Sequence, residues 1–449
     1  MKLSVNLSDI ATLVGGELHG PSVLSTGLAI DSRTIESGNL FVALKGARVD
    51  GHDYLGSAKE AGAAGALVSE LRSVELPQIL VDDTQYALER FAAWYRSQLN
   101  ARFIGVTGSA GKTTVKSLLA HILNGQAKVG ATKGNYNNEL GVPLTLLSFG
   151  EEVEFSVVEM GARFKGDIAH LCQLVKPQIR ILTAVLPAHI GTFGSLDVIA
   201  QTKGEIFDDM QSSDLAIMTA DVPYVGAWTE RIGGRALTYG FAEDADVRIV
   251  DAQDQGLDGV AFGIEGVLGV HEFHSPLLGL HNVGNVLACI IAALECGLPI
   301  ELIRSQLATF QAVDGRMRIL TLSSGQRVID DSYNANPAAT QGALSVLSNT
   351  SGCRFAVLGT MAELGENERA YHSEVSELAL ELELDAVWCV GSLWPVIENK
   401  SFRYFHDADE VVGHLTEIPQ FDVALVKGSR SVGLDKVVEA LAHPETRSC

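Results

Sequence analysis

The chain has 449 residues, of which 47% are apolar and 20% charged, so we expect a folded protein of two to four domains. Its formal net charge of −22 argues against a duplex nucleic-acid partner, because binding to a phosphate backbone needs a broad basic surface. No apolar run reaches the roughly 18 residues that span a bilayer, and we expect neither a membrane span nor a signal peptide. Six cysteines without a CxxC pair favour reduced thiols, and with them a cytoplasmic protein.

The predicted elements begin with a mixed segment over residues 1–98, which closes in a helix over residues 84–99. A buried strand is predicted at residues 102–107, and apolar periodicity predicts a helix over residues 112–123. Two further strands and a helix are predicted at residues 155–160, 179–186 and 195–207. Strands that alternate with helices of this length indicate a parallel sheet with crossover helices.

The chain then changes character twice. Residues 243–273 alternate and carry many glycines and aspartates, which is typical of a small antiparallel excursion, and a helix is predicted over residues 283–295. From Arg316 onward a new alternation of strands and helices predicts a separate α/β unit of roughly 130 residues. Its predicted strands are residues 327–333, 355–360, 385–390 and 422–428. We therefore predict three α/β domains at residues 1–98, 99–313 and 314–449.

An anion-binding loop is predicted between the strand at residues 102–107 and the helix that follows. Its glycines let backbone N–H groups face phosphate oxygens, Lys112 can reach the β- and γ-phosphates, and the Thr113 hydroxyl can ligate Mg²⁺. Only two residues separate its first glycine from the Gly-Lys pair, where motors and small GTPases have four. The loop, a shortened phosphate loop for ATP, reads Thr107, Gly108, Ser109, Ala110, Gly111, Lys112, Thr113, Thr114.

This loop is the first of several motifs that occur in the same order in the Mur ligases, and the chain resembles that family over nearly its whole length. The later motifs are GNYNN at residues 134–138, VVEMG at 157–161, PAH at 187–189, LHNVGN at 280–285 and DDSYNANP at 330–337. The N-terminal motifs are similar to those of the family member that adds D-alanyl-D-alanine, and they are AIDSRTI at residues 29–35, LFVALKG at 40–46 and DGHDY at 50–54.

The resemblance implies an enzyme with an N-terminal domain for the UDP part of UDP-N-acetylmuramoyl-tripeptide (UDP-MurNAc-tripeptide). A central parallel-sheet domain would bind ATP, and a Rossmann-like C-terminal domain would close over both. ATP would phosphorylate the terminal carboxylate of the tripeptide, and the amine of D-alanyl-D-alanine (D-Ala-D-Ala) would then attack the acyl phosphate. The resemblance further implies Mg²⁺ as cofactor, a monomer, and neither nucleic acid nor membrane as partner.

Roles of individual residues follow from the resemblance alone. It implies that Lys112, Glu159, His189, Lys203 and Arg316 are catalytic, and that Lys203 is carbamylated. Without it, Lys203 would be an exposed helix lysine, and His189 a structural histidine. The implied metal ligands are Thr113, Glu159, His189 and Lys203. The implied ATP-binding residues beyond the loop are Asn137, Asn138, His281, Asn282, Asn285, Arg316, Asp331, Tyr333, Asn334 and Asn336. The UDP side would be Ser32, Arg33, Asp50, Gly51 and His52, and the peptide side Lys427, Ser429 and Arg430.

Some of these positions have ordinary alternatives. Asn282 could cap a helix, and the turn from Asn334 to Pro337 could be plain turn chemistry. The chain also departs from its relatives at Thr360, where they typically carry an acidic residue before AELG.

Four competing functions are weighed against the D-Ala-D-Ala ligase. The sibling that adds the third residue carries an Asp-Asn-Pro-Arg motif, which this sequence lacks. The siblings that add the first two residues have a dinucleotide-like glycine fingerprint, which is also missing. Folate and cyanophycin ligases should lack the N-terminal motifs, and a non-catalytic nucleotide-binding regulator would not need Lys112, Glu159, His189 and Lys203. Whether the tripeptide ends in diaminopimelate or lysine stays open.

Overall fold

The computed structural model describes residues 4–46, 48–187 and 193–443, and it has the α/β fold with several parallel sheets. Contact density divides the chain into two units. The first comprises Met1–Val106, Gln126–Ala162 and Gly166–Ile179, and the second comprises Thr107–Gly125, Arg163–Lys165 and Arg180–Cys449. This division does not test the predicted domain limits, which stay predictions. In the described part of the chain, no helix combines the length and the apolar character that a bilayer crossing requires.

The first unit contains a five-stranded sheet in the order β2-β7-β6-β5-β4. Its strands are β2 (Glu17–His19), β4 (Gly27–Ala29), β5 (Asn39–Val42), β6 (Gly65–Val68) and β7 (Gln78–Leu80), and only β2 runs antiparallel to its neighbour. The helices beside it are α1 (Leu7–Val14), α2 (Leu55–Glu60) and α3 (Thr84–Gln98). Every residue of β5 and β6 is buried, as expected of parallel strands covered on both faces.

The same unit contains three strands of the predicted parallel sheet. They are β8 (Arg102–Thr107), β9 (Val129–Ala131) and β10 (Phe155–Glu159), and β10 lies between the other two. Helix α3 contacts α5 (Gly141–Ser148) and α6 (Asp167–Val175). Because all three strands run parallel, the C-terminal residue of β10, Glu159, lies at the sheet edge where α/β proteins bind ligands.

The second unit begins with α4 (Lys112–Asn124), which packs against α10 (His281–Glu295). Strands β11 (Ile179–Leu182), β12 (Leu215–Thr219) and β13 (Arg235–Gly240) precede the predicted antiparallel excursion. The excursion consists of β14 (Val247–Asp254), β15 (Val260–Gly266) and β16 (His271–Ser275). The remaining helices of this part are α8 (Leu196–Gly204), α9 (Val225–Thr229) and α11 (Ile300–Thr309), together with the 3-10 turn η3 (Glu205–Phe207).

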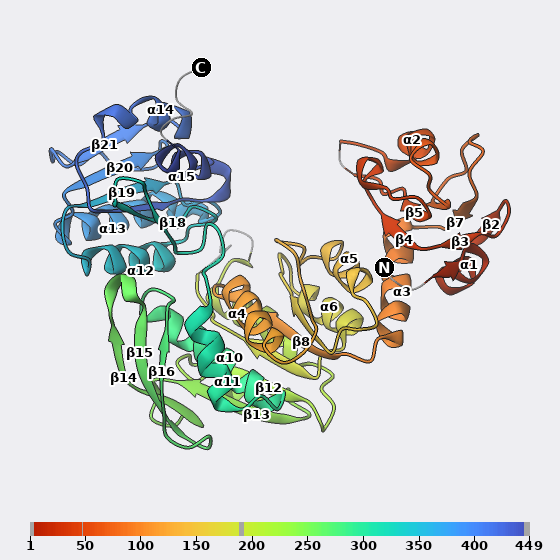
Figure 1. The fold of residues 1–449 in the computed structure, drawn as a ribbon, viewed down its shortest axis with the longest axis horizontal. Helices are drawn as coiled ribbons and strands as arrows, with labels where there is room; N and C mark the ends of the chain where they lie inside the picture. The colour runs from red at the N-terminus through yellow and green to blue at the C-terminus, as the bar shows by residue number, and fades with distance from the viewer. Residues whose placement is uncertain (1–3, 47, 188–192, 444–449) are drawn as a thin grey trace. The chain divides into compact units, whose positions relative to one another are not determined.

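The C-terminal part of this unit is a six-stranded sheet in the order β17-β18-β22-β19-β20-β21. Its strands are β17 (Arg318–Thr321), β18 (Arg327–Asp331), β19 (Arg354–Gly359), β20 (Ala386–Val390), β21 (Phe402–Phe405) and β22 (Val423–Lys427). Only β17 is antiparallel to its neighbour. Two apolar cores cover its two faces, one with α12 (Pro337–Ser348) and α13 (Glu368–Glu381), the other with α14 (Ala408–Gly413) and α15 (Asp435–Ala442) (Figure 1).

Candidate active site

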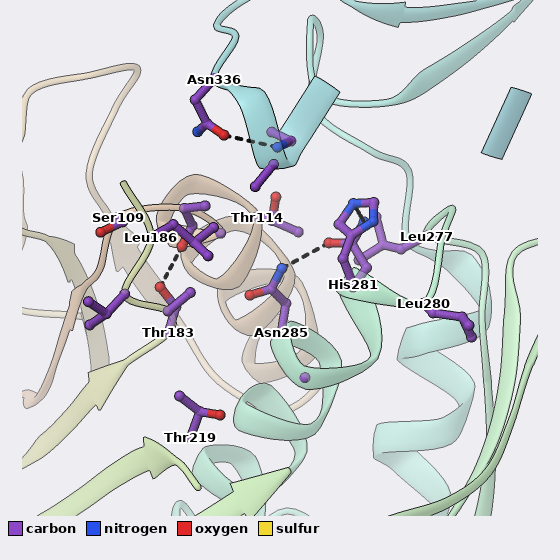
Figure 2. A pocket seen from close by; sticks show the side chains of 18 of the residues that line it. Ser109, Thr114, Thr183, Leu186, Thr219, Leu277, Leu280, His281, Asn285 and Asn336 are labelled. Carbon is purple, nitrogen blue, oxygen red and sulfur yellow. Dashed lines mark hydrogen bonds between the residues drawn. The ribbon is translucent and has the colours of Figure 1, made fainter. Parts of the chain in front are cut away.

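The predicted anion-binding loop joins β8 to α4 and turns at two glycines. Gly108 and Gly111 have φ angles of 150° and 80°, which glycine adopts without a steric penalty. A Cβ on Gly108 would lie 2.1 Å from Oγ1 of Thr183, so only glycine fits there. The Thr183 hydroxyl donates to the Ala110 carbonyl at 2.5 Å, as Figure 2 shows below the loop. The end of β11 therefore fixes the shape of the loop.

Lys112 is the first residue of α4, and its Nζ donates to the Gly108 carbonyl at 2.7 Å. The ammonium is thus folded back over the loop that it follows. The first backbone N–H groups of a helix have no acceptor within the helix, and the helix dipole makes that end positive. The loop, the helix end and the ammonium together form a cradle for an anion, as phosphate sites require.

A pocket of about 450 Å³ opens at this loop, entirely within the second unit. Three helices begin at it, namely α4, α10 and α12, and Figure 2 shows residues of all three facing the cavity. Three positive helix ends favour a polyanionic ligand. The predicted site residues that line the pocket are Ser109, Ala110, Gly111, Thr114, His281, Asn282, Asn285, Arg316, Asp331, Asn334, Asn336 and Lys427.

The first turn of α10 carries a chain of hydrogen bonds that ends at the loop. Asn285 donates to Oδ1 of Asn282 at 2.9 Å, and Asn282 donates to the Leu278 carbonyl at 2.8 Å and to Nε2 of His281 at 3.2 Å. A Cβ on Gly111 would lie 2.2 Å from Oδ1 of Asn285, so the amide packs directly on the loop. Asn282 does not cap the helix, because its amide bonds to a carbonyl rather than to a free N–H.

His281 lines the pocket and is exposed there, at the start of α10. Burial of the charged form lowers the pKa of this imidazole, while the charge of Asp331 raises it and that of Lys427 lowers it. Because Nε2 accepts from Asn282, the proton of the neutral ring is on Nδ1. His281 is therefore neutral at pH 7 and can serve the ligand as a donor or through its ring face.

Sequence reasoning missed the apolar lining of the pocket, which consists of Val185, Leu186, Val222, Tyr239, Phe241, Leu277 and Leu280. Phe241 and Leu280 keep 48% and 42% of their surface exposed. Large apolar side chains exposed in a pocket suit the flat face of a nucleobase. The carboxylate of Asp221 accepts the backbone N–H groups of Phe241 at 2.8 Å and Ala242 at 2.9 Å, which fixes the turn that presents Phe241. No local signal marks these residues, since strand ends of any core look alike.

In the C-terminal sheet, Asp331 and Lys427 end the neighbouring strands β18 and β22 and stand opposite each other. Nζ of Lys427 lies 2.5 Å from Oδ2 of Asp331, and the two side chains are only 2% and 10% exposed. Lys427 also donates to the Asn334 carbonyl at 3.0 Å, and Asp331 accepts the Met317 N–H at 3.2 Å. Asp331 and Lys427 therefore form a buried pair in the wall of the pocket, and both residues line it.

The guanidinium of Arg316 lies over the ring of Tyr333, with 4.3 Å between Cζ and the ring centroid. Arg430 approaches the same ring at 6.0 Å. Its side chain is 62% exposed and pairs with Asp435 at 2.9 Å. The two arginines predicted for phosphate and peptide thus share one aromatic neighbour.

Two other predicted residues of this part hold loops in place. Asn336 caps α12, since its Oδ1 accepts the Ala339 N–H at 2.9 Å (Figure 2). Ser429 is buried, and its Oγ accepts the Ala362 N–H at 2.9 Å. The hydroxyl of Thr360 donates to the Val390 carbonyl at 3.1 Å, so this side chain has a structural bond.

Glu159, in the first unit, ends β10 with only 2% of its surface exposed. Its Oε1 accepts from Asn137 at 2.8 Å, but its Oε2 is buried without a hydrogen-bond partner in the described chain. A buried carboxylate oxygen without a partner is costly, and a divalent cation satisfies it. The residue therefore fits the implied Mg²⁺. Asn138 is used locally, because its Oδ1 accepts the Gly141 N–H at 2.9 Å.

Lys203 lies in the last turn of α8, in the second unit, and is only 3% exposed. Its Nζ is 5.7 Å from the centroid of the Phe193 ring. The sequence alone predicts an exposed helix lysine, and that prediction is wrong. Trp228 packs on the same helix, since its Nε1 donates to the Ala200 carbonyl of α8 at 3.1 Å. His189 lies outside the described residues.

The predicted UDP-side residues form two short turns of the N-terminal sheet. Arg33, with a side chain 87% exposed, pairs with Asp31 at 2.6 Å, and that pairing lowers the Asp31 pKa to about 2. Asp50 accepts the backbone N–H of His52 at 3.0 Å, which is the main reason that its pKa is lowered. The buried His52 ring bonds to Asp50 at 2.6 Å and accepts the Ser69 N–H at 3.0 Å, so both its nitrogens are engaged.

The other two UDP-side residues belong to the same turns. Ser32 begins the first 3-10 turn, η1 (Ser32–Thr34), and Gly51 begins the second, η2 (Gly51–Tyr54). A Cβ on Gly51 would lie 2.7 Å from the Leu44 backbone nitrogen, so the second turn needs glycine. Contact of these residues with a nucleotide stays a prediction.

A cavity that collects helix ends and ammonium groups is built for a polyphosphate, so the fold and the site define an α/β nucleotide-binding protein. Three models of one family match its sequence. They are the Mur ligase family catalytic domain at residues 25–96, the Mur ligase middle domain at 106–293 and the Mur ligase glutamate ligase domain at 315–430. The chain belongs to the Mur ligase family.

Relatives match the chain from end to end. The UDP-N-acetylmuramoyl-tripeptide–D-alanyl-D-alanine ligase of Escherichia coli K12 is 37% identical, over 99% of this chain and 100% of its own length. The ligase of the same name from Bacillus subtilis is 34% identical, over 97% and 98%. A crystal structure of MurF from Acinetobacter baumannii is 29% identical and superposes with a TM-score of 0.90, covering 98% of this chain and 99% of that one. A Thermotoga maritima MurF in complex with ADP is 29% identical and has a TM-score of 0.83, covering 94% and 98%.

Proposed function

We propose that this Mur ligase uses ATP to join D-Ala-D-Ala to UDP-MurNAc-tripeptide. The observation that carries the proposal is the likeness along 99% of the chain to a relative named for this reaction. The pocket supports it independently, because a loop, helix ends and basic side chains around one cavity suit ATP.

The reaction needs an activated carboxyl group, since a free carboxylate is a poor electrophile. A carboxylate oxygen of the tripeptide attacks the γ-phosphorus, and ADP leaves. The amine of D-Ala-D-Ala then attacks the acyl phosphate, the C–O bond breaks, and inorganic phosphate and a proton are released. In this scheme the loop and Lys112 hold the phosphates, and Arg316 offsets charge on the transferring group, as such transition states require.

Mg²⁺ bound at this site would neutralise phosphate oxygens as charge develops on them. Glu159 fits as its ligand because Oε2 is buried and has no hydrogen-bond partner among the residues that the structure describes. Asn137 fixes the other oxygen and so orients the carboxylate. We assign the remaining metal contacts to Thr113, His189 and Lys203 on the family resemblance.

Lys203 is proposed to be carbamylated. A buried ammonium is disfavoured by the loss of hydration, and a second cation nearby would disfavour it further. Reaction of the neutral amine with CO₂ forms an N–C bond and releases a proton, which replaces the positive charge with an anion. Carbamate oxygens are ligands that Mg²⁺ prefers.

The other substrates are assigned to the outer parts of the chain. The turns of Ser32, Arg33, Asp50, Gly51 and His52 are proposed to face the UDP group. The residues proposed to face the peptides are Lys427, Ser429 and Arg430. A basic Arg33 that protrudes from its turn supports the first assignment. We further propose a cytoplasmic monomer, in keeping with the five cysteines that the structure describes as free thiols.

A phosphate-release assay with an omission series tests the proposal. Release should require ATP, UDP-MurNAc-tripeptide and D-Ala-D-Ala together, and should stop when any one is left out. A sibling ligase would accept a shorter UDP-peptide with a single amino acid, and a regulator would release no phosphate with any combination. Either result would overturn the proposed function.

A further inference from the structure

We propose that Tyr333 is a positioning residue, whose aromatic face holds the Arg316 guanidinium in place at the nucleotide pocket. The inference rests on the proposed function, since Arg316 is there assigned to the transferring phosphate. The family resemblance implies only that Tyr333 is an ATP-binding residue, whereas the role inferred here is indirect and acts through Arg316.

The backbone around Arg316 is fastened to the loop that carries Tyr333. The Gly315 N–H donates to Oδ2 of Asp330 at 2.9 Å, and the Tyr333 N–H donates to the Gly315 carbonyl at 3.2 Å. Gly315 has a φ of 71°, and a Cβ there would lie 2.9 Å from Cβ of Tyr333. Met317 on the other side donates its N–H to Asp331 at 3.2 Å. The link between α11 and β17 is therefore tied at both neighbours of Arg316.

The side chain of Arg316 has the Tyr333 ring as its clearest partner. Its Cζ lies 4.3 Å from the ring centroid, well inside the range of a cation–π contact. No carboxylate among residues 4–46, 48–187 and 193–443 forms an ion pair with Arg316. The nearby acids are otherwise engaged, since Asp331 pairs with Lys427. A ring contacts the flat face of a guanidinium and leaves its N–H donors, which lie in the plane, available to an anion.

Arg316 lines the pocket together with Asn334 and Asn336. A long side chain loses considerable rotamer freedom when it is fixed on a ligand. Contact with Tyr333 restricts the Arg316 side chain before the ligand binds, so less rotamer freedom is lost on binding, which is the usual benefit of preorganisation. The hydroxyl of Tyr333 has no part in this argument, because the ring face alone makes the contact.

The test is a double-mutant cycle. Tyr333→Leu removes the aromatic face and should lower kcat/KM for ATP roughly 2- to 30-fold, the rate equivalent of a cation–π contact. Tyr333→Phe keeps the face and should stay within about twofold of wild type. In an Arg316→Ala background, Tyr333→Leu should have no further effect, because contacting residues couple and independent ones add.

Phe405→Leu is the matched control. Phe405 lies 5.3 Å from Cζ of Arg403 in the same sheet but does not line the pocket, so its loss should leave kcat/KM for ATP unchanged. The inference is overturned if Tyr333→Leu equals wild type, if Tyr333→Phe is as impaired as Tyr333→Leu, or if the loss persists in the Arg316→Ala background. The last result would assign the effect to Arg430, to direct ligand contact or to general structure.

Turnover by the wild-type enzyme, measured alongside, tests the proposed function separately. If the wild-type enzyme does not ligate, the Kd for ATP of the same set of variants, measured by calorimetry, still decides the role of Tyr333. Coupling between the two substitutions would then support the positioning role, and additivity would contradict it.

Discussion

Replacing Glu159 by glutamine should separate activity from stability. The carboxylate has one oxygen bonded to Asn137 at 2.8 Å and one buried oxygen without a partner in the described ranges of the chain. Glutamine has the same shape and can keep the bond from Asn137 through its own oxygen. Its NH₂ group then takes the place of the unpartnered oxygen, and an amide nitrogen does not ligate Mg²⁺.

The expected loss of activity is large. Removing a group that stabilises charge at a reacting phosphate costs about 2 to 4 kcal/mol, or roughly 30- to 1,000-fold in kcat. The stability of the metal-free protein should not fall with the activity. A buried polar group without a partner costs about 1 to 3 kcal/mol and a charged one costs more, so the neutral amide avoids the part of the cost that is due to the charge. We therefore expect Glu159→Gln to unfold at the same or a higher temperature than wild type.

The assay is a Mg²⁺ titration of phosphate release at saturating substrates, paired with thermal unfolding without metal. Glu89→Gln is the matched control, because Glu89 is a buried carboxylate of the same unit that pairs with His170 at 3.1 Å. It should leave the Mg²⁺ dependence as in wild type. A Glu159→Gln enzyme with wild-type turnover and Mg²⁺ dependence would refute the metal assignment, and a large drop in unfolding temperature would refute the account of the unpartnered oxygen.

Three further substitutions test other parts of the site. Lys112→Ala should lose several kcal/mol of transition-state stabilisation, and therefore most of its turnover, while its unfolding temperature stays unchanged. Near-normal phosphate release by this variant would show that the loop does not hold the phosphates. Lys203→Ala should be almost inactive. Small carboxylic acids should restore part of the activity of Lys203→Ala but should not restore the activity of Lys112→Ala. A fully active Lys203→Ala would exclude the carbamate. Lys427→Met should cost about 3 to 5 kcal/mol of stability in denaturant unfolding, because it leaves Asp331 buried and uncompensated, and a loss below about 1 kcal/mol would contradict that pairing.

The sequence predicted the part of the fold where local signals agree. Strand β8 has the predicted limits, and α4 begins at the predicted Lys112, because a buried apolar run, a glycine turn and a helical periodicity follow one another. Strand β11 is shorter than predicted and ends at Leu182 rather than at residue 186. Beyond it the Ala184 carbonyl accepts the Ser109 N–H at 2.7 Å, so the backbone serves the loop instead of a strand.

Other errors also reflect tertiary structure. Helix α10 begins at His281 rather than at the predicted Val283, since its first turn is polar and faces the pocket. The edge strands β17 and β21 were not predicted, because each has only four residues, of which none is buried in β17 and two are buried in β21. The predicted helix over residues 195–207 is α8 followed by the 3-10 turn η3.

The site was predicted by resemblance more than by physics. The loop could be read from its residues, but the burial of Lys203 depends on tertiary packing around α8, which the local sequence does not show. The apolar wall around Phe241 depends on where strands end in space. The unpartnered oxygen of Glu159 can be seen only once the neighbours of β10 are known.

One measurement tests most directly the central claim that ATP activates the tripeptide carboxylate as an acyl phosphate before the amide bond forms. UDP-MurNAc-tripeptide labelled with ¹⁸O in that carboxylate is incubated with ATP, Mg²⁺ and D-Ala-D-Ala, and the products are weighed by mass spectrometry. The account predicts a UDP-peptide heavier by one dipeptide less water, and one ¹⁸O atom in each inorganic phosphate released. Phosphate without the label, or phosphate released at the same rate without D-Ala-D-Ala, would contradict it.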